Sequence, residues 1–351
     1  MATASTQQAL LVTELGKPLT LTTSRPIPQP GPSQIQIRVT VAGLNPHDQK
    51  ARDYGLFIAS NLPAVISNDV VGRVTALGSS VNNFAIGDRV VSQASFSPGS
   101  LQNGLQQYAV LDADFTAKIP DDVSDDEAAT LPCNTLAPLL AIFDPSTLDF
   151  PAPWTPEAST FNYANTTLLV IGGGSSCGKF GVQLAALAGF GRIVVVGGDE
   201  SELKSYGATH VLDRHGGDDL VLSRIRAVVG DDLVYAYDAI NPPSGQHLAL
   251  NALSNTKRGK LARLLPTGPV NESKIHAKQA GYEIKNVMGS SHLFPNLTKP
   301  YWERLPQYLK AGSIKPLRFV VEHGLDADKV NEVLDRYRDG KKVIKTHIHL
   351  A

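Results

Sequence analysis

The run from Leu168 to Leu187 constrains the fold more than any other part of the chain. A short apolar stretch leads into Gly172-Gly173-Gly174, and apolar residues then recur at helical spacing. A strand that ends in a glycine-rich turn and opens into a helix is the context in which such glycines indicate dinucleotide binding. Glycine lets the backbone approach a pyrophosphate, while N–H groups at the helix start face the phosphates. The alternative is a tight strand–helix turn that binds no nucleotide.

The chain after this turn alternates strands with helices. We expect strands at residues 167–171, 193–196, 210–212, 233–238 and 260–265. This alternation predicts parallel strands joined by crossover helices, which is a doubly wound sheet. The chain before this alternating region has short strands separated by Gly, Pro, Asn and Asp residues. The chain after it has mixed α and β segments. The sequence therefore predicts an α/β protein with a β-rich substrate domain, residues 1–130 and 275–351, and a cofactor-binding domain, residues 131–274.

Composition limits the classes of partner. The chain has 351 residues, of which 42% are hydrophobic, so two folded domains are expected. The formal net charge is −1 and the basic residues are dispersed, which argues against nucleic acid or an anionic membrane as the main partner. Only Cys133 and Cys177 are present, and no signal peptide or membrane-spanning run is found. We therefore expect a cytoplasmic protein.

Five short motifs follow one another along the chain. They are Asn45-Pro46-His47-Asp48, Asp69-Val70-Val71-Gly72-Arg73-Val74, Gly87-Asp88-Arg89-Val90, Gly173-Gly174-Ser175-Ser176-Cys177-Gly178 and the segment of residues 203–211. In this order they resemble the medium-chain dehydrogenase/reductase superfamily, in its zinc-independent quinone/enoyl-reductase branch, across nearly the whole chain. The fungal trans-acting enoyl reductases are similar more loosely. The resemblance implies a GroES-like β-rich catalytic domain and a Rossmann domain with a parallel sheet.

Zinc alcohol dehydrogenases of the same superfamily carry ligands that this sequence lacks. Their early cysteine position falls near residues 43–45, and their Gly-His-Glu position reads Ser67-Asn68-Asp69. A zinc site needs about three thiolate, imidazole or carboxylate ligands, so we expect no metal. Without a Lewis acid, oxidation of a plain alcohol loses its activator. Hydride delivery to a conjugated C=C bond remains feasible, because the carbonyl or quinone itself stabilises the enolate.

The end of the second nucleotide-domain strand bears on the choice of cofactor. It reads Val196-Gly197-Gly198, where members that select NAD carry an acidic residue. Glycine there favours NADPH, although Asp199 and Glu200 follow directly and weaken the inference. Lys204 and Arg214 are the nearest positive residues, and the alternative for Lys204 is an exposed helix lysine. We expect NADPH to be held by Gly173, Gly174, Ser175, Ser176, Cys177, Gly197, Lys204 and Asn134.

Three residues near the first motif are candidates for acting on the substrate. The resemblance implies that Tyr54 donates a proton or contacts the carbonyl, that Lys50 stabilises enolate charge, and that Asn45 holds the nicotinamide ribose or the substrate. The alternative for Tyr54 is an aromatic lid, and for Asn45 a cap on the following turn. Lys50 would alternatively pair with Asp48 or Asp53 on the surface.

These observations together predict an NADPH-dependent, zinc-independent oxidoreductase. It reduces the C=C bond of an α,β-unsaturated carbonyl, a quinone or an enoyl thioester in secondary metabolism. The substrate is a small molecule, either free or tethered to a polyketide synthase carrier domain, and the protein is a monomer or a homodimer. The alternative is a non-redox descendant of the fold, a dehydratase, cyclase, decarboxylase or nucleotide-binding protein that acts on a biosynthetic intermediate.

Overall fold

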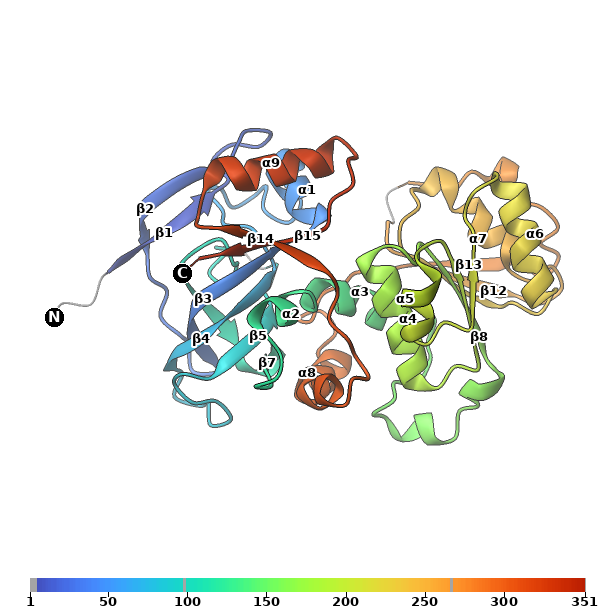
Figure 1. The fold of residues 1–351 in the computed structure, drawn as a ribbon, viewed down its shortest axis with the longest axis horizontal. Helices are drawn as coiled ribbons and strands as arrows, with labels where there is room; N and C mark the ends of the chain where they lie inside the picture. Colours follow the sequence, from blue (N-terminus) through green and yellow to red (C-terminus); the bar gives the residue numbers. More distant parts are fainter. Residues whose placement is uncertain (1–4, 97–98, 266–267, 351) are drawn as a thin grey trace. The chain divides into compact units, whose positions relative to one another are not determined.

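The computed structural model describes residues 5–96, 99–265 and 268–350 (Figure 1). The chain divides into two compact units. The first, called the β-rich unit below, runs to Cys133 and also contains Ser290–Ala311 and the chain from Pro316 onward. The second, called the Rossmann unit, contains Asn134–Gly289 and Gly312–Lys315. The β-rich unit is thus assembled from segments on both sides of the Rossmann unit in the sequence.

A mixed sheet forms the body of the β-rich unit. Within the described residues its path is β14-β15-β3-β4-β5-β7, and β6 pairs with β3. Their bounds are β3 Gln34–Leu44, β4 Asp69–Leu77, β5 Arg89–Gln93, β6 Tyr108–Asp112, β7 Thr116–Lys118, β14 Phe319–His323 and β15 Lys345–His349. Ile35, Ile37 and Val39 alternate along β3 and are all buried, which is the period of a strand with one face on a core. A separate antiparallel pair consists of β1 Thr6–Leu11 and β2 Thr20–Pro26.

Short helices flank this sheet. Helix α1, Pro46–Tyr54, starts directly after β3 with proline at its first position, where no N–H is needed, and ends at Gly55 in the left-handed conformation. Helix α9, Ala327–Arg338, packs on α1. Helices α2, Asp125–Ala129, and α8, Pro295–Lys310, complete the unit. Ser124 and Glu127 form a capping box at the start of α2.

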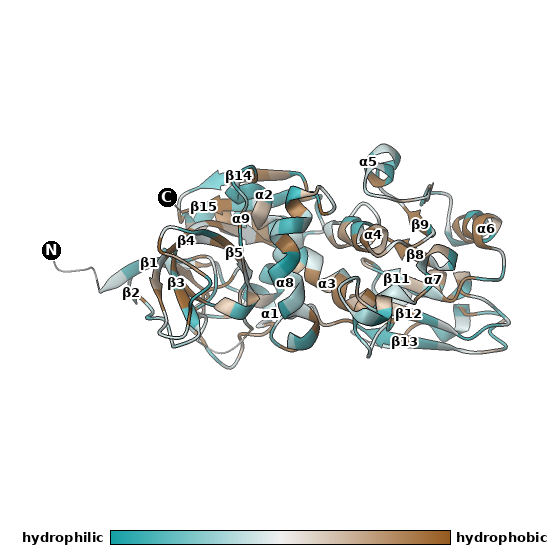
Figure 2. Ribbon diagram, turned by 90° about the horizontal axis from the view of Figure 1, so that it is seen from below, coloured by the Kyte–Doolittle hydropathy of each residue, from teal (hydrophilic) through white to brown (hydrophobic). Residues whose placement is uncertain are grey.

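The Rossmann unit is built on a parallel sheet with the order β10-β9-β8-β11-β12-β13. The strands are β8 Thr167–Ile171, β9 Arg192–Val196, β10 His210–Leu212, β11 Tyr235–Asp238, β12 Gly259–Arg263 and β13 Tyr282–Asn286. The helices are α3 Pro132–Phe143, α4 Ser176–Ala188, α5 Glu200–Ser205, α6 Asp218–Val229 and α7 His247–Ala252. Strands β8 and β9 consist mostly of hydrophobic residues (Figure 2). Nearly all of these residues are buried, as expected for a sheet covered on both faces. The predicted doubly wound α/β architecture is confirmed.

One detail differs from the sequence expectation. Residues 275–289, expected in the β-rich domain, lie in the Rossmann unit, because β13 pairs in parallel with β12 and extends its sheet. Between the two units, α2 ends at Ala129 and α3 begins at Pro132. Proline has no N–H to donate, so it is tolerated at a helix start better than inside a helix.

None of the helices in the described part of the chain is long and apolar enough to cross a membrane.

Candidate functional site

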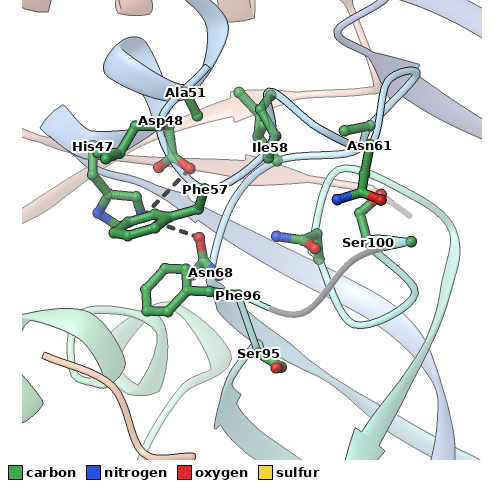
Figure 3. A pocket seen from close by; sticks show the side chains of 15 residues that line it. His47, Asp48, Ala51, Phe57, Ile58, Asn61, Asn68, Ser95, Phe96 and Ser100 are labelled. Atoms are coloured by element: carbon green, nitrogen blue, oxygen red, sulfur yellow. Dashed lines mark hydrogen bonds and ion pairs between the residues drawn. The ribbon is translucent and has the colours of Figure 1, made fainter. Parts of the chain in front are cut away.

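A pocket in the β-rich unit opens beside the start of α1 (Figure 3). Its free volume is about 20 Å³, room for about one water molecule, and α1 lines it with His47, Asp48 and Ala51. The remaining lining residues are Leu56, Phe57, Ile58, Asn61, Ala64, Ile66, Asn68, Ser95, Phe96, Gly99, Ser100 and Asn103. An apolar wall with a few polar groups is typical of small-molecule sites, but those sites have a free volume of about 300 Å³ or more.

The aromatic wall of the pocket is held in an uncommon conformation. Phe57 has a φ of 66°, a left-handed conformation that bulky side chains rarely adopt. Its ring lies against Phe96, with ring centroids 4.2 Å apart. The turn follows Gly55, whose φ of 74° ends α1 and sends the chain back over the helix. The conformational cost at Phe57 is thus offset by a ring contact that faces the pocket.

Next to the pocket, a buried polar network surrounds Asp69. Its carboxylate accepts a 2.7 Å hydrogen bond from the Asn45 amide, another of 2.7 Å from the Cys133 N–H, and an ion-pair contact from the Lys345 ammonium. The Lys345 ammonium also donates to the Asn45 Oδ1 at 2.9 Å. Asp48 is fully buried as well, and its two carboxylate oxygens accept from the N–H groups of Asn45 and Ser67.

The pKa values of the Asp69 and Asp48 carboxyls depend on whether a cation lies beside them. Burial alone would raise the pKa of Asp69, but the Lys345 ammonium and the surrounding hydrogen bonds hold it below its usual value. Asp48 has no such direct cation, and burial raises its pKa. Burial, together with the Asp69 charge, also raises the pKa of the Cys133 thiol. The thiol is therefore neutral and poorly nucleophilic.

Asn45 and Asp69 belong to the two segments that differ from zinc alcohol dehydrogenases, and they meet in the network just described. Asp69 bonds to Asn45, to the Cys133 N–H and to the Lys345 ammonium, which also donates to Asn45. Within residues 5–96, 99–265 and 268–350, no three His, Cys, Asp or Glu side chains are arranged to hold a metal ion. A lysine ammonium, bonded to Asn45 and Asp69, supplies the positive charge at this place.

The three predicted catalytic residues occupy different surroundings. Asn45 lies inside the buried network and caps α1 through its N–H bond to Asp48. Tyr54, at the last turn of α1, is 72% exposed and is not among the residues that line the pocket. Lys50 is half-buried, and in the described part of the chain it forms no pair with Asp48 or Asp53.

The glycine turn of the Rossmann unit is shaped by close backbone contacts. A Cβ on Gly173 would lie 2.2 Å from the Val195 Cγ1 and 2.5 Å from the Gly197 carbonyl oxygen, so only glycine fits. A Cβ on Gly174 would instead meet nothing nearer than the Gly198 Cα at 3.4 Å. Ser175 caps α4, and its hydroxyl accepts from the Gly178 N–H at 3.0 Å. Ser176 and Cys177 form the first helical positions of α4, whose N–H groups have no partner within the helix.

This turn lies where the strand order reverses, because β8 has β9 on one side and β11 on the other. Such a switch point is where doubly wound sheets bind nucleotides. The residues present therefore fit a dinucleotide: glycines allow close backbone approach, and the α4 N-terminus presents N–H groups and a positive dipole end.

Lys204 and Arg214, the two candidates for binding the cofactor phosphate, differ in their surroundings. The Lys204 ammonium pairs with Glu200 at 2.7 Å on the exposed side of α5. Arg214 instead lies along the end of β9, and a Cβ built on Gly197 would come within 3.0 Å of its Cδ. Among the described residues, the Arg214 guanidinium forms no hydrogen bond or ion pair.

Asn134 and Cys177 also meet within the Rossmann unit. The Cys177 thiol contacts the Asn134 Oδ1 at 3.9 Å. The Tyr237 hydroxyl on β11 is buried near Cys177, and no protein atom among the described residues accepts its hydrogen bond.

Comparison with known proteins identifies the family. Residues 31–121 match the alcohol dehydrogenase GroES-like domain. The trans-enoyl reductase tazE of Aspergillus terreus is 34% identical over 73% of this chain and 84% of its own length. The chain belongs to the enoyl/quinone-reductase branch of the medium-chain dehydrogenase/reductase superfamily. The dehydrogenase orsE of Emericella nidulans matches the reductase at 28% identity over 99% of this chain and its own full length.

The fold agrees with that assignment. A mycobacterial protein solved in complex with NADPH superposes with a TM-score of 0.72 at 24% identity, over 98% of the reductase and 99% of its own chain. The predicted GroES-like and Rossmann architecture and the predicted superfamily are both confirmed.

Sequence reasoning missed three groups of this reductase that line or support the pocket: His47, Phe96 and Lys345. His47 stands inside the first motif, and a proline at the first helical position already places it in the first turn of α1. No local signal marks Lys345, because its partner lies 276 residues earlier. Phe96 lies in an irregular segment, and its contact with Phe57 depends on tertiary structure.

Proposed function

We propose that this reductase uses NADPH to reduce the C=C bond of an α,β-unsaturated carbonyl compound. The observation that carries the proposal is the glycine cradle at α4, with Gly173 in contact with β9 and Arg214 lying along Gly197. When bound, NADPH supplies the hydride for the β carbon. Gly173, Gly174, Ser175, Ser176 and Cys177 hold its pyrophosphate, and Asn134 lies beside Cys177 at the same end of α4.

The cofactor preference rests on the end of β9. Gly197 places no carboxylate where a 2′-phosphate would be repelled, and Arg214 offers a guanidinium that other described groups leave unbound. Lys204 remains a second candidate, although its pairing with Glu200 directs it away from this role. We therefore assign the adenosine phosphate to Arg214 before Lys204.

We place the substrate beside α1, where the pocket would have to widen to admit it, because its free volume is about 20 Å³. Its wall of Phe57, Phe96 and Ile66 suits an unsaturated acyl chain or ring, and the amides of Asn61 and Asn103 suit a carbonyl or thioester. The relatives named trans-enoyl reductases favour an enoyl thioester carried by a polyketide synthase carrier domain, in secondary metabolism. Lys50, Tyr54 and Asn45 remain our candidates for contacts to the substrate, and their single substitutions test that assignment.

The decisive experiment follows the loss of NADPH absorbance with four substrates: a quinone, an alkenal, an enone and an enoyl thioester. A metal chelator is present throughout, and NADH is run in parallel. Turnover that survives the chelator, with NADPH preferred, supports the proposal, and the preferred substrate narrows the class. Tight NADPH binding without consumption in any sample would overturn it and favour a non-redox role.

A further inference from the structure

We propose that β14 pairs with the β14 of a second copy of this chain, so that two molecules share one continuous sheet. Strand β14 is at one end of the sheet path in the β-rich unit, and β15 is its single neighbour among the described strands (Figure 1). Edge strands carry unpaired N–H and C=O groups and readily add a further strand. All residues of the contact belong to the β-rich unit, and neither cofactor nor substrate takes part in it.

The backbone of β14 has a row of unused hydrogen-bonding groups. Directly after the strand, the Gly324 N–H donates to the His349 carbonyl oxygen of β15 at 2.8 Å. Successive N–H groups of an extended chain point to opposite edges, so those of Phe319, Val321 and His323 point away from β15. In the part of the chain that the structure describes, none of these three N–H groups has an acceptor. They are therefore available to a further strand.

Exposed apolar side chains lie along the same edge. Val320 is 41% exposed, and Ile344, directly before β15, is 49% exposed. The register of the two strands pairs Phe319 with Lys345, and its continuation sets Arg318 beside Ile344. Residues two apart along a strand share a face, so Ile344 and Val320 lie on the same side of the sheet. A strand added at this edge would cover part of that apolar surface.

An edge of the Rossmann sheet is built differently. Strand β13 carries Glu283 and Lys285, whose side chains pair with each other at 2.8 Å. Arg258 also binds Glu283, at 3.1 Å. Charged side chains on an edge strand are a common means of preventing pairing with another chain. In β14, the three residues from Phe319 to Val321 are all hydrophobic. The contact therefore lies at β14 and not at β13.

Charge complementarity points to a second copy as the occupant. Arg318 is exposed, and no described residue forms an ion pair or hydrogen bond with its guanidinium. Glu322 is partly exposed and reaches only Lys329, at 3.5 Å. Arg318, Val320 and Glu322 alternate along the chain and share one face. In an antiparallel pair with its twofold axis at Val320, Arg318 of each copy is opposite the partner's Glu322, so this segment complements itself.

The same axis suits the backbone. It pairs Phe319 with the partner's Val321, and the outward N–H and C=O groups of these two residues then face each other. An axis at Val321 would instead set Val320 against the partner's Glu322 and leave Arg318 opposite Gly324. Opposite charges that face each other across two strands are stabilising, and like charges are destabilising. The charges therefore select the axis at Val320.

The test uses two charge reversals and sedimentation velocity over a wide range of protein concentration. Arg318→Glu sets two glutamates against each other, and Glu322→Arg sets two arginines against each other. Each variant alone should raise the dissociation constant of the dimer about tenfold or more. An equimolar mixture of the two variants restores both opposite-charge pairs, and it should form a mixed dimer with a dissociation constant close to the native one.

The matched control is Arg73→Glu. Arg73 is an exposed arginine of β4, which has β3 and β5 on its two sides, so this variant should dimerise like the native chain. Circular dichroism and the melting temperature should be native in all three variants, because the substituted side chains are at the surface and the Glu322–Lys329 pair is exposed. A native chain that stays monomeric up to its solubility limit would overturn the proposal.

Hydrogen exchange locates the contact without any substitution. The N–H groups of Phe319 and Val321 should exchange about threefold or more slowly in concentrated than in dilute native protein, and this protection should disappear in Arg318→Glu. A dimer that survives both charge reversals, with protection at β13 in place of β14, would move the contact to the Rossmann sheet and refute the assignment. Failure of the mixed variants to associate would refute the register.

Discussion

Asp69 and Lys345 form a buried ion pair across 276 residues of sequence. The carboxylate comes from the first residue of β4 and the ammonium from the first residue of β15. Asn45 lies between them, donating to the carboxylate and accepting from the ammonium. A buried pair of this kind gains stability only while both partners and their hydrogen bonds are present.

Lys345→Met should therefore be strongly destabilising. The substitution leaves Asp69 charged and buried, and we expect the free energy of unfolding to fall by about 3–5 kcal/mol. The loss should be smaller at acidic than at neutral pH, because protonation removes the uncompensated charge. Urea unfolding followed by circular dichroism measures both effects. The control is the double variant Lys345→Met/Asp69→Asn, which should recover at least half of the loss; equal losses in the single and double variants would contradict the argument.

Gly173 and Gly174 should respond differently to alanine. Gly173→Ala places a Cβ 2.2 Å from Val195 and 2.5 Å from the Gly197 carbonyl, so we expect a loss of about 1–3 kcal/mol in stability. Gly174→Ala meets only a 3.4 Å contact and should keep native stability, yet raise the Kd for NADPH about tenfold or more. Thermal melts and NADPH fluorescence titrations separate the two outcomes. Native NADPH affinity in Gly174→Ala would place the pyrophosphate elsewhere.

Arg214→Gln should reduce the preference for NADPH over NADH. A charge-assisted hydrogen bond to phosphate contributes about 1.5–3 kcal/mol, so the Kd for NADPH should rise about 10- to 100-fold while that for NADH stays unchanged. Lys204→Gln is the matched control, because its ammonium already pairs with Glu200. A larger rise in the Kd for NADPH in Lys204→Gln than in Arg214→Gln would indicate that the phosphate binds at Lys204 on α5.

Asp112 should contribute to stability in a pH-dependent way. The hydrogen bond from His292, opposed by burial and assisted by Gln34 and Gln102, lowers the pKa of Asp112 to about 2. A carboxyl with a lowered pKa stabilises the fold above its unfolded pKa, and the effect is lost as pH falls through the folded pKa. The native protein should therefore exceed Asp112→Asn by up to about 2 kcal/mol above about pH 4, and this difference should vanish near pH 2. Urea unfolding across this range checks it; a constant difference would refute the role of ionisation.

The parts of the fold that the sequence predicts well are those marked by local patterns. Strand β8 has the expected bounds, because an apolar run that leads into glycines is a local signal. Strands β13 and β14 lack such signals: their residues are mostly only partly buried, and pairing with β12 and β15 defines them. The same reason explains why the Asp69–Lys345 network was not predicted.

The place of β15 has a consequence for the order in which the molecule is made. Strand β15 lies between β14 and β3, and it carries the ammonium that neutralises Asp69. A ribosome therefore releases β3, β4 and the whole Rossmann unit before the cation of the β-rich unit exists. Until then the nascent sheet exposes the edge of β3 and holds a carboxylate without its partner. A chain interrupted shortly before Lys345 should consequently remain a substrate for chaperones and proteases, even with its Rossmann unit folded.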